Sequence, residues 1–131
     1  MRVKVSLIVI FALLMFVPRV EAATKKQSLD GTKISGDVKH PDETKPDPDT
    51  LIFKDGKFHS TACDEYGFGD GSYSTAAKGD AVTFDAVTKN KDGNSIVWHG
   101  IVSGDKATAT GLWSDSHGKT DTFAFTGTVM K

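Results

Sequence analysis

The sequence has only one cysteine, Cys63, in 131 residues. A single thiol cannot form a disulfide within the chain, so a disulfide-stabilised scaffold is excluded. An excess of charge of one sign is also lacking, because 16 lysines and arginines balance 17 aspartates and glutamates. With 38% hydrophobic residues, this composition is ordinary for a globular protein and excludes an acidic disordered tail or a collagen-like fibre.

Long apolar runs are absent after the first 22 residues. Two basic residues precede the apolar run Val5–Val17, and Val20 and Ala22 supply the small residues that favour cleavage. The run is shorter than the roughly 20 residues that span a bilayer. We therefore predict a cleaved secretory signal over residues 1–22 and one exported domain, periplasmic or secreted, over residues 23–131. No stable membrane anchor is expected.

Removal of the predicted signal would take away a net charge of +2 and leave a mature chain of net charge −3. This mild acidity disfavours nucleic acid as a partner, because nucleic-acid binders carry basic patches. The mature length suits a single small domain, which we expect to be a monomer.

Turn signals recur at short, even intervals after residue 49. Asp55-Gly56 separates two apolar segments and predicts a two-residue hairpin turn. Several segments alternate apolar with polar residues, as half-buried strands do. The predicted strands are Ser28–Val38, Thr50–Lys54, Lys57–Ala62, Ser72–Ala77, Ala81–Lys89, Ser95–Ser103, Lys106–Ser114 and Lys119–Met130, with a proline-rich loop at His40–Asp49.

Glycine and an aromatic residue lie two positions apart, on one face, in each of the last three predicted strands. The segments are Trp98-His99-Gly100, Gly111-Leu112-Trp113 and Phe125-Thr126-Gly127. Glycine inside a strand marks a bend or a close approach, which suggests that aromatic rings pack over these glycines in a strongly coiled sheet. We predict an all-β fold in which about eight antiparallel strands form an up-and-down meander and close into a small barrel. The alternative is a two-sheet β-sandwich.

The chain resembles the calycin group, which includes lipocalins, fatty-acid-binding proteins, avidins and their small secreted bacterial relatives. The resemblance rests on size, the opening Leu29-Asp30-Gly31-Thr32 and the strand series ending in Phe125-Thr126-Gly127. Lipocalins usually carry a tryptophan just after the opening glycine, whereas Lys33 and Ile34 follow here. The resemblance implies a lipocalin-like barrel that binds a small hydrophobic ligand or inhibits an enzyme, and it transfers no binding residues.

The most informative segment runs from His59 to Tyr73. It combines a thiol, a histidine, three carboxylates, three aromatic residues and glycines, where a hairpin connection needs only two to five residues. Its aromatic residues either plug one barrel end or line the mouth of a ligand cavity. His59 and Cys63, with His99, are weak candidates for zinc or copper ligands. Asp64, Glu65 and Asp70 match no EF-hand spacing for calcium.

Catalytic motifs are missing. The sequence has no Gly-x-Ser-x-Gly elbow, no His-Glu-x-x-His and no phosphate-binding glycine loop. We therefore expect a non-catalytic protein without a cofactor.

Three functions remain open. The first is an exported binder that holds a small apolar or aromatic ligand in or at the mouth of the barrel. Its candidate ligand-binding residues are Tyr66, Phe68, Tyr73, Phe84, Trp98, Trp113 and Phe125. The second is a protein–protein module, such as a hydrolase inhibitor, that acts through the loop at residues 63–73. The third is a metal or haem carrier that uses His59, Cys63 or His99.

Overall fold

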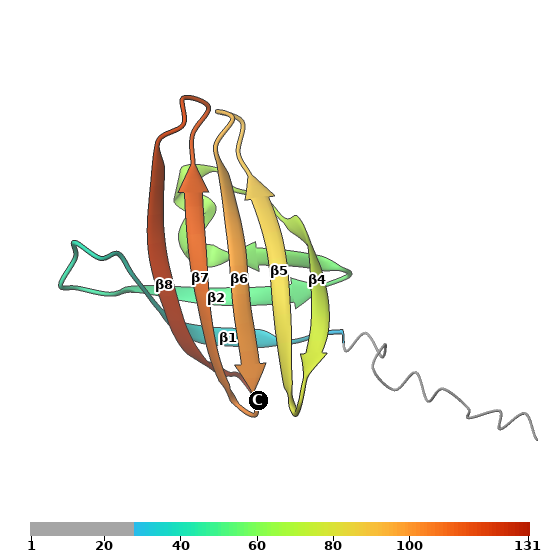
Figure 1. Ribbon diagram of the computed structural model, residues 1–131. Helices are drawn as coiled ribbons and strands as arrows, with labels where there is room; N and C mark the ends of the chain where they lie inside the picture. The colour runs from blue at the N-terminus through green and yellow to red at the C-terminus, as the bar shows by residue number, and fades with distance from the viewer. Residues whose placement is uncertain (1–27) are drawn as a thin grey trace, which may run out of the picture.

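The computed structural model describes residues 28–131, so the predicted signal at residues 1–22 lies outside the described part of the chain. Eight antiparallel strands follow one another in space in the order of the sequence, and the last pairs with the first to close a barrel (Figure 1). The strands are β1 Lys33–Lys39, β2 Asp47–Lys54, β3 Lys57–Ser60, β4 Gly71–Lys78, β5 Ala81–Lys89, β6 Ser95–Ser103, β7 Lys106–Ser114 and β8 Thr120–Val129. The predicted meander is confirmed and the sandwich is excluded.

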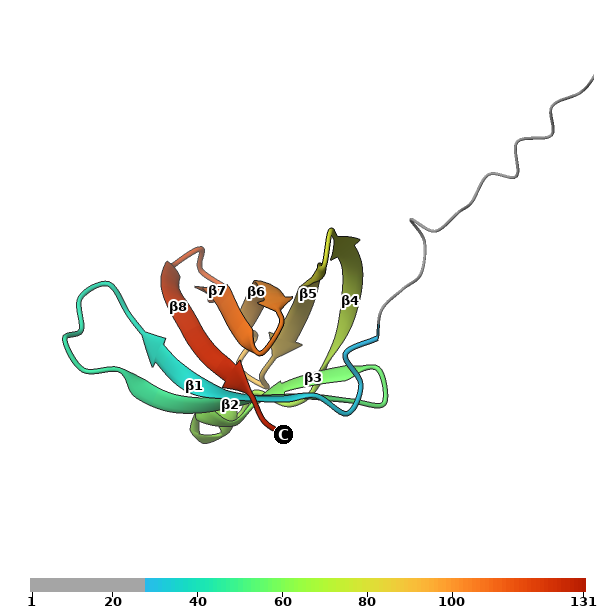
Figure 2. The same cartoon turned by 90° about the horizontal axis from the view of Figure 1, so that it is seen from below.

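The barrel has two unequal sides. Seen from below, β1, β2 and β3 form one side, and β4 to β8 curve over them (Figure 2). Only two residue pairs, Lys57 with Ser72 and Phe58 with Gly71, join β3 to β4. One short helix, η2 (Thr61–Tyr66), interrupts the ladder at this seam. In residues 28–131 no helix is long and apolar enough to cross a membrane.

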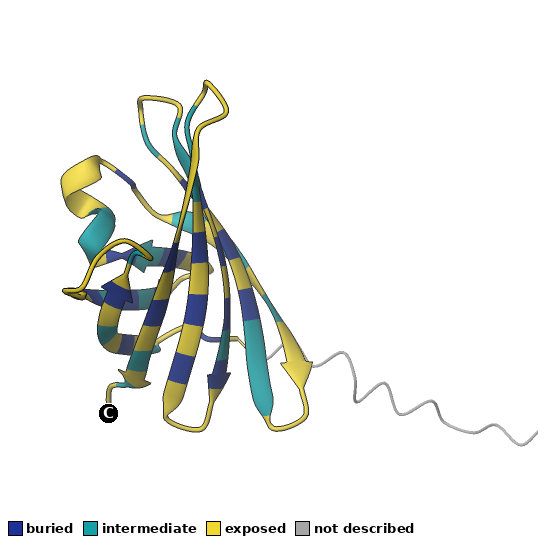
Figure 3. Ribbon diagram, turned by 60° about the vertical axis from the view of Figure 1, so that its left-hand side comes forward, coloured by how far each residue is buried: buried dark blue, intermediate teal, exposed yellow. Residues whose placement is uncertain are grey.

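Buried and exposed residues alternate along the strands, as the pleat of a sheet requires (Figure 3). The inward positions carry aromatic rings that fill the middle of the barrel. Phe58 lies between Phe53 and Trp98, with ring centroids 5.3 and 5.1 Å away. Trp98 in turn lies 5.0 Å from Phe123. The largest fully buried side chains are Trp98, Phe53, Phe58, Phe84, Phe125, Ile34 and Leu51.

The glycines of β6, β7 and β8 do make room for aromatic rings. A Cβ at Gly127 would lie 2.6 Å from Cζ of Phe125, the partner suggested by the sequence. At Gly100 and Gly111, however, the covering rings are those of Phe84 and Phe123, which come from the neighbouring strands. Aromatic residues therefore pack across the ladder as well as along it.

A methyl group at Gly111 is expected to lower the free energy of unfolding by about 1–3 kcal/mol, the usual cost of overpacking a core. In Gly111→Ala the new Cβ would overlap the ring of Phe123. The matched control is Gly69→Ala, because a Cβ at Gly69 would meet nothing within 4 Å. Chemical denaturation of both variants checks this. Equal stability of the two variants would contradict the packing described for Gly111.

Three predicted strand boundaries are wrong by more than one residue. The first strand, predicted from Ser28, begins at Lys33, because Asp30-Gly31 forms a turn with positive φ at Gly31. The loop assigned to His40–Asp49 ends earlier, because β2 begins at Asp47 and includes Pro48. Pro48 pairs with Asp37 of β1 on one side. On its other side no strand of the described chain is paired, because β3 pairs with β2 only from Leu51 onward. The missing amide N–H of Pro48 therefore removes no hydrogen bond to β3. The strand predicted over Lys57–Ala62 ends at Ser60, where η2 begins.

Candidate functional site

A cavity of ≈ 1150 Å³ lies at one end of the barrel. In an up-and-down meander, every second connection lies at the same end, and the four connections at this end line the cavity. They are the segments between β1 and β2, β3 and β4, β5 and β6, and β7 and β8, and we call this end the loop end. The other three connections of the barrel lie at the opposite end. They are short turns such as Asp55-Gly56, where both residues have positive φ.

Four of the seven predicted ligand-binding residues line this cavity. Trp98 and Phe68 are buried, Trp113 is half-buried, and Tyr66 at the end of η2 has 64% of its surface exposed. Tyr66 therefore stands at the rim, whereas Trp98 reaches the packed middle of the barrel. Aromatic surface thus extends from the mouth of the cavity toward the core.

The other three predicted residues lie outside the cavity lining. Phe84 and Phe125 are fully buried beneath Gly100 and Gly127. The hydroxyl of Tyr73 donates to Oδ1 of Asp30, which also accepts from the backbone N–H of Gly56. These donors hold the pKa of Asp30 below its ordinary value, with the Tyr73 hydroxyl as the main cause. Asp30 thereby ties the start of the described chain to the β2–β3 turn through Gly56 and to β4 through Tyr73.

Apart from Glu65, the acidic residues of the lining were not among the residues expected to form a site. From residues 28–131, six carboxylates line the cavity, against one lysine, Lys119, and one histidine, His40. They are Asp42, Asp47, Asp49, Glu65, Asp92 and Asp121. The sequence pattern could have identified this acidic group. Most of its residues lie in or beside every second connection, and a meander brings these connections to one end of the barrel.

Asp49 is the buried member of this set, with only 3% of its surface exposed. Its Oδ2 accepts from the Ser60 hydroxyl at 2.6 Å, and its Oδ1 accepts from the backbone N–H of Ala62 at 3.0 Å and from the Thr61 hydroxyl at 3.3 Å. Ser60, at the N-cap position of η2, makes no side-chain capping bond. Asp49 therefore caps the helix from the neighbouring strand, which explains why the chain leaves β3 at this point.

The carboxylates at the mouth of the cavity change the pKa of the Tyr66 hydroxyl. The carboxylate of Glu65 is the main reason that the pKa of Tyr66 is raised above its ordinary value, and Asp47 adds to the same effect. Like charges disfavour a further anion, so a phenolate at this position is disfavoured. The rim is thus electrostatically negative around Tyr66.

Cys63 lies on η2 and is half-buried against the core. Burial raises the pKa of its thiol, the charges of Asp49 and Asp64 raise it further, and a hydrogen bond with Ser60 lowers it by a smaller amount. Cys63 is therefore a neutral thiol at neutral pH.

Alkylation of Cys63 by iodoacetamide is expected to be slower than that of N-acetylcysteine at every pH below the ordinary thiol pKa. The raised pKa reduces the thiolate fraction, and the thiolate is the species that reacts. The rate should keep rising with pH above the range where N-acetylcysteine reaches its plateau. Reaction as fast as the free thiol at neutral pH would contradict the described burial.

The three candidate metal ligands are not brought together. His99 lies on the outer face of β6, where Nδ1 is 2.6 Å from Oδ1 of Asp85. His59 lies on β3, with Nε2 2.7 Å from Asp64 Oδ1 and Nδ1 2.9 Å from Asp70 Oδ1, although the contact at Nδ1 is not aligned as a hydrogen bond. Within residues 28–131, no three His, Cys, Asp or Glu side chains are arranged to hold a metal ion.

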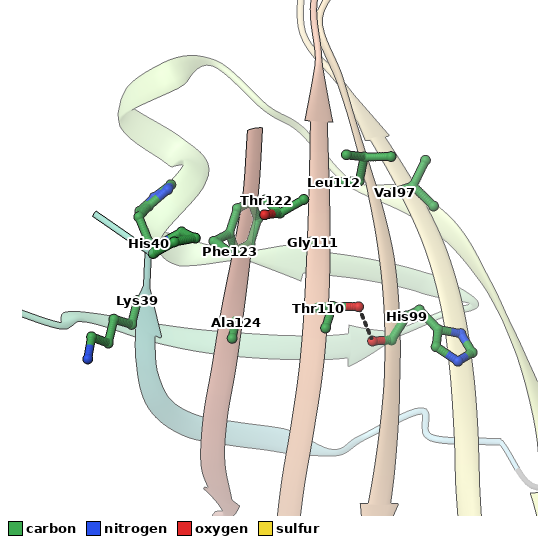
Figure 4. A pocket seen from close by; sticks show the side chains of 11 residues that line it. Lys39, His40, Val97, His99, Thr110, Gly111, Leu112, Thr122, Phe123 and Ala124 are labelled. Carbon is green, nitrogen blue, oxygen red and sulfur yellow. Dashed lines mark hydrogen bonds between the residues drawn. The ribbon is translucent and has the colours of Figure 1, made fainter. Parts of the chain in front are cut away.

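A second depression, of ≈ 640 Å³, lies on the outside of the sheet over β6, β7 and β8. Figure 4 shows Val97 and Leu112 projecting from this outer face, with His99 beside them. Val97 and Leu112 are a cross-strand pair and are 44% and 40% exposed. His40 and Phe123, whose ring centroids lie 5.4 Å apart, line both depressions and form the wall between them.

The fold and this site define a closed eight-stranded antiparallel barrel with a partly aromatic, acidic cavity at its loop end. Comparison of the chain with protein-family models, with curated proteins and with solved structures finds no match.

Proposed function

We propose that this protein is a calycin-like, exported, non-catalytic binder that holds a small apolar or aromatic ligand in the loop-end cavity. The observation that carries the proposal is the cavity itself, at ≈ 1150 Å³, with Phe68, Trp98 and Trp113 in its lining. Cavities of roughly 300–1,000 Å³ hold most drug-sized ligands, so the space is sufficient for one such molecule.

The packing of the barrel supports this position for the ligand. The middle of the barrel is filled by Phe53, Phe58, Phe84 and Phe125, which are fully buried. A small barrel either fills with side chains or holds one ligand. Here side chains fill the middle of the barrel, and the cavity at the loop end leaves space for a ligand. A ligand would therefore rest on Trp98 as its floor and leave through the four connections.

A bulky residue in the cavity should abolish binding of a neutral aromatic probe, N-phenyl-1-naphthylamine, measured by its fluorescence. In Ala62→Trp the new side chain would occupy space in the loop-end cavity. The matched control is Ala124→Trp, which adds the same bulk to the outer depression. We expect loss of binding in the first variant and retention in the second.

The opposite result would move the site to the outer depression. Failure of the unmodified protein to bind the probe would contradict the proposal. Circular dichroism of both variants establishes that each retains the barrel.

A second candidate function, inhibition of an exported hydrolase through the loop at residues 63–73, is favoured by Tyr66. This side chain is large, apolar in most of its surface and 64% exposed at the end of η2. Tyrosine is a frequent interface anchor. Substitution Tyr66→Ala would weaken inhibition of such a partner. Inhibition by an unmodified protein that binds no N-phenyl-1-naphthylamine would favour this function over the first.

A further inference from the structure

The charge of the loop-end cavity restricts what it can bind. Its six carboxylates come from different parts of the chain, and among the described residues Lys119 is the one lysine or arginine in the lining. His40 offers a second basic group, with Nδ1 3.4 Å from Oδ2 of Asp121. A concave site lined by one sign of charge concentrates ions of the opposite sign. The lining therefore favours a cation and disfavours an anion.

Asp49 gives this preference a specific acceptor inside the cavity. The carboxylate is buried, and its three hydrogen-bond donors, two hydroxyls and one backbone amide, are all neutral. In the described part of the chain no lysine, arginine or histidine lies within ion-pair distance of it. A carboxylate has about four acceptor sites, so one site on Oδ2 is left for a ligand donor.

Trp98 supplies an independent observation at the same cavity. Its side chain is 0% exposed, and within residues 28–131 its Nε1 has no hydrogen-bond partner. A buried N–H without a partner is rare, and each such group calls for an explanation. Trp98 lines the cavity, so an acceptor atom on a bound ligand would satisfy this donor.

We infer that the ligand is a cationic amphiphile: an amine or ammonium group attached to an apolar or aromatic body that also carries a hydrogen-bond acceptor. This inference rests on the proposed binding function. The ammonium group is held by Asp49 and the surrounding carboxylates. Aromatic faces of Trp113 and Tyr66 add cation–π attraction at the mouth. The body lies against Phe68 and Trp98, where the acceptor meets the indole N–H.

Three probes that share a phenyl ring and a short linker test the inference: 2-phenylethylamine, 2-phenylethanol and 3-phenylpropanoate. Isothermal titration of the full protein should show that the amine binds at least about tenfold more tightly than the carboxylate, with the alcohol between them, because one charge contact at the protein surface is enough for that difference. Added salt should weaken binding of the amine and strengthen that of the carboxylate.

The substitution Asp49→Asn tests the assignment of the cation acceptor. Asparagine keeps an oxygen for the Ala62 N–H but removes the charge, so the amine should lose several-fold more affinity than the alcohol does. The matched control is Asp80→Asn, an equal change of charge in the β4–β5 turn, outside the cavity lining. The control should leave all three affinities unchanged.

Each other outcome overturns a defined part of the account. If the three probes bind equally, the cationic preference is contradicted while the binding function stands. If Asp80→Asn weakens the amine as much as Asp49→Asn does, the preference reflects net charge and the assignment to this cavity is contradicted. If neither these probes nor N-phenyl-1-naphthylamine binds, the proposed function itself fails.

Discussion

Replacement of Trp98 by alanine should lower the free energy of unfolding by about 3–5 kcal/mol, the range measured for large aromatic residues in cores. Trp98 is fully buried, and its ring lies 5.1 Å from that of Phe58 and 5.0 Å from that of Phe123. Removal of the indole ring would leave an empty space between the loop-end cavity and the packed side chains in the middle of the barrel. A loss of this size is a large share of the stability of a domain of about 100 residues.

Urea denaturation followed by far-UV circular dichroism measures this loss without relying on tryptophan fluorescence. The matched control is Trp113→Ala, because Trp113 is half-buried and carries the same side chain. We expect a clearly smaller loss in the control. Similar losses in the two variants would contradict the distinction between a filled middle and an open loop end.

Replacement of Asp49 by alanine should lower the free energy of unfolding by about 2–4 kcal/mol. A hydrogen bond to a charged group contributes about 1.5–3 kcal/mol, and a helix cap adds ~1 kcal/mol. The alanine variant leaves the buried Ser60 hydroxyl without its acceptor and uncaps η2. The cavity wall formed by η2 should therefore loosen, which amide hydrogen exchange over residues 61–66 would report.

The control for this substitution is Asp49→Asn, which retains an acceptor for Ala62 and should lose much less stability. The two variants together separate the structural role of Asp49 from its charge. An asparagine variant as unstable as the alanine variant would show that capping does not explain the burial of Asp49.

The strand order and most turns of this barrel follow from local signals. Asp55-Gly56 predicts a tight hairpin, and the structure shows positive φ at both residues. Because Phe53 and Phe58 flank that turn symmetrically, they also pair directly across it. Alternation along β6 and β7 identifies the inward faces, including the positions of Trp98 and Gly111. These features depend on neighbours within a few residues.

The helix η2 and the division of the barrel into a filled and an open part depend on contacts distant in the sequence. The donors of Ser60 and Ala62 meet Asp49, more than ten residues earlier. Phe84 covers Gly100 from the neighbouring strand, where the sequence pattern suggested Trp98. Register and side-chain packing across the barrel decide such contacts, and alternation alone does not determine them.

Native mass spectrometry of the protein, purified from the cells that make it, tests the central claim most directly. We expect an additional mass on the folded protein that is lost when the same sample is denatured, and the released molecule should carry an amine or ammonium group. A protein that is bare before denaturation, and remains bare after incubation with 2-phenylethylamine and N-phenyl-1-naphthylamine, would contradict the account of a ligand-binding barrel.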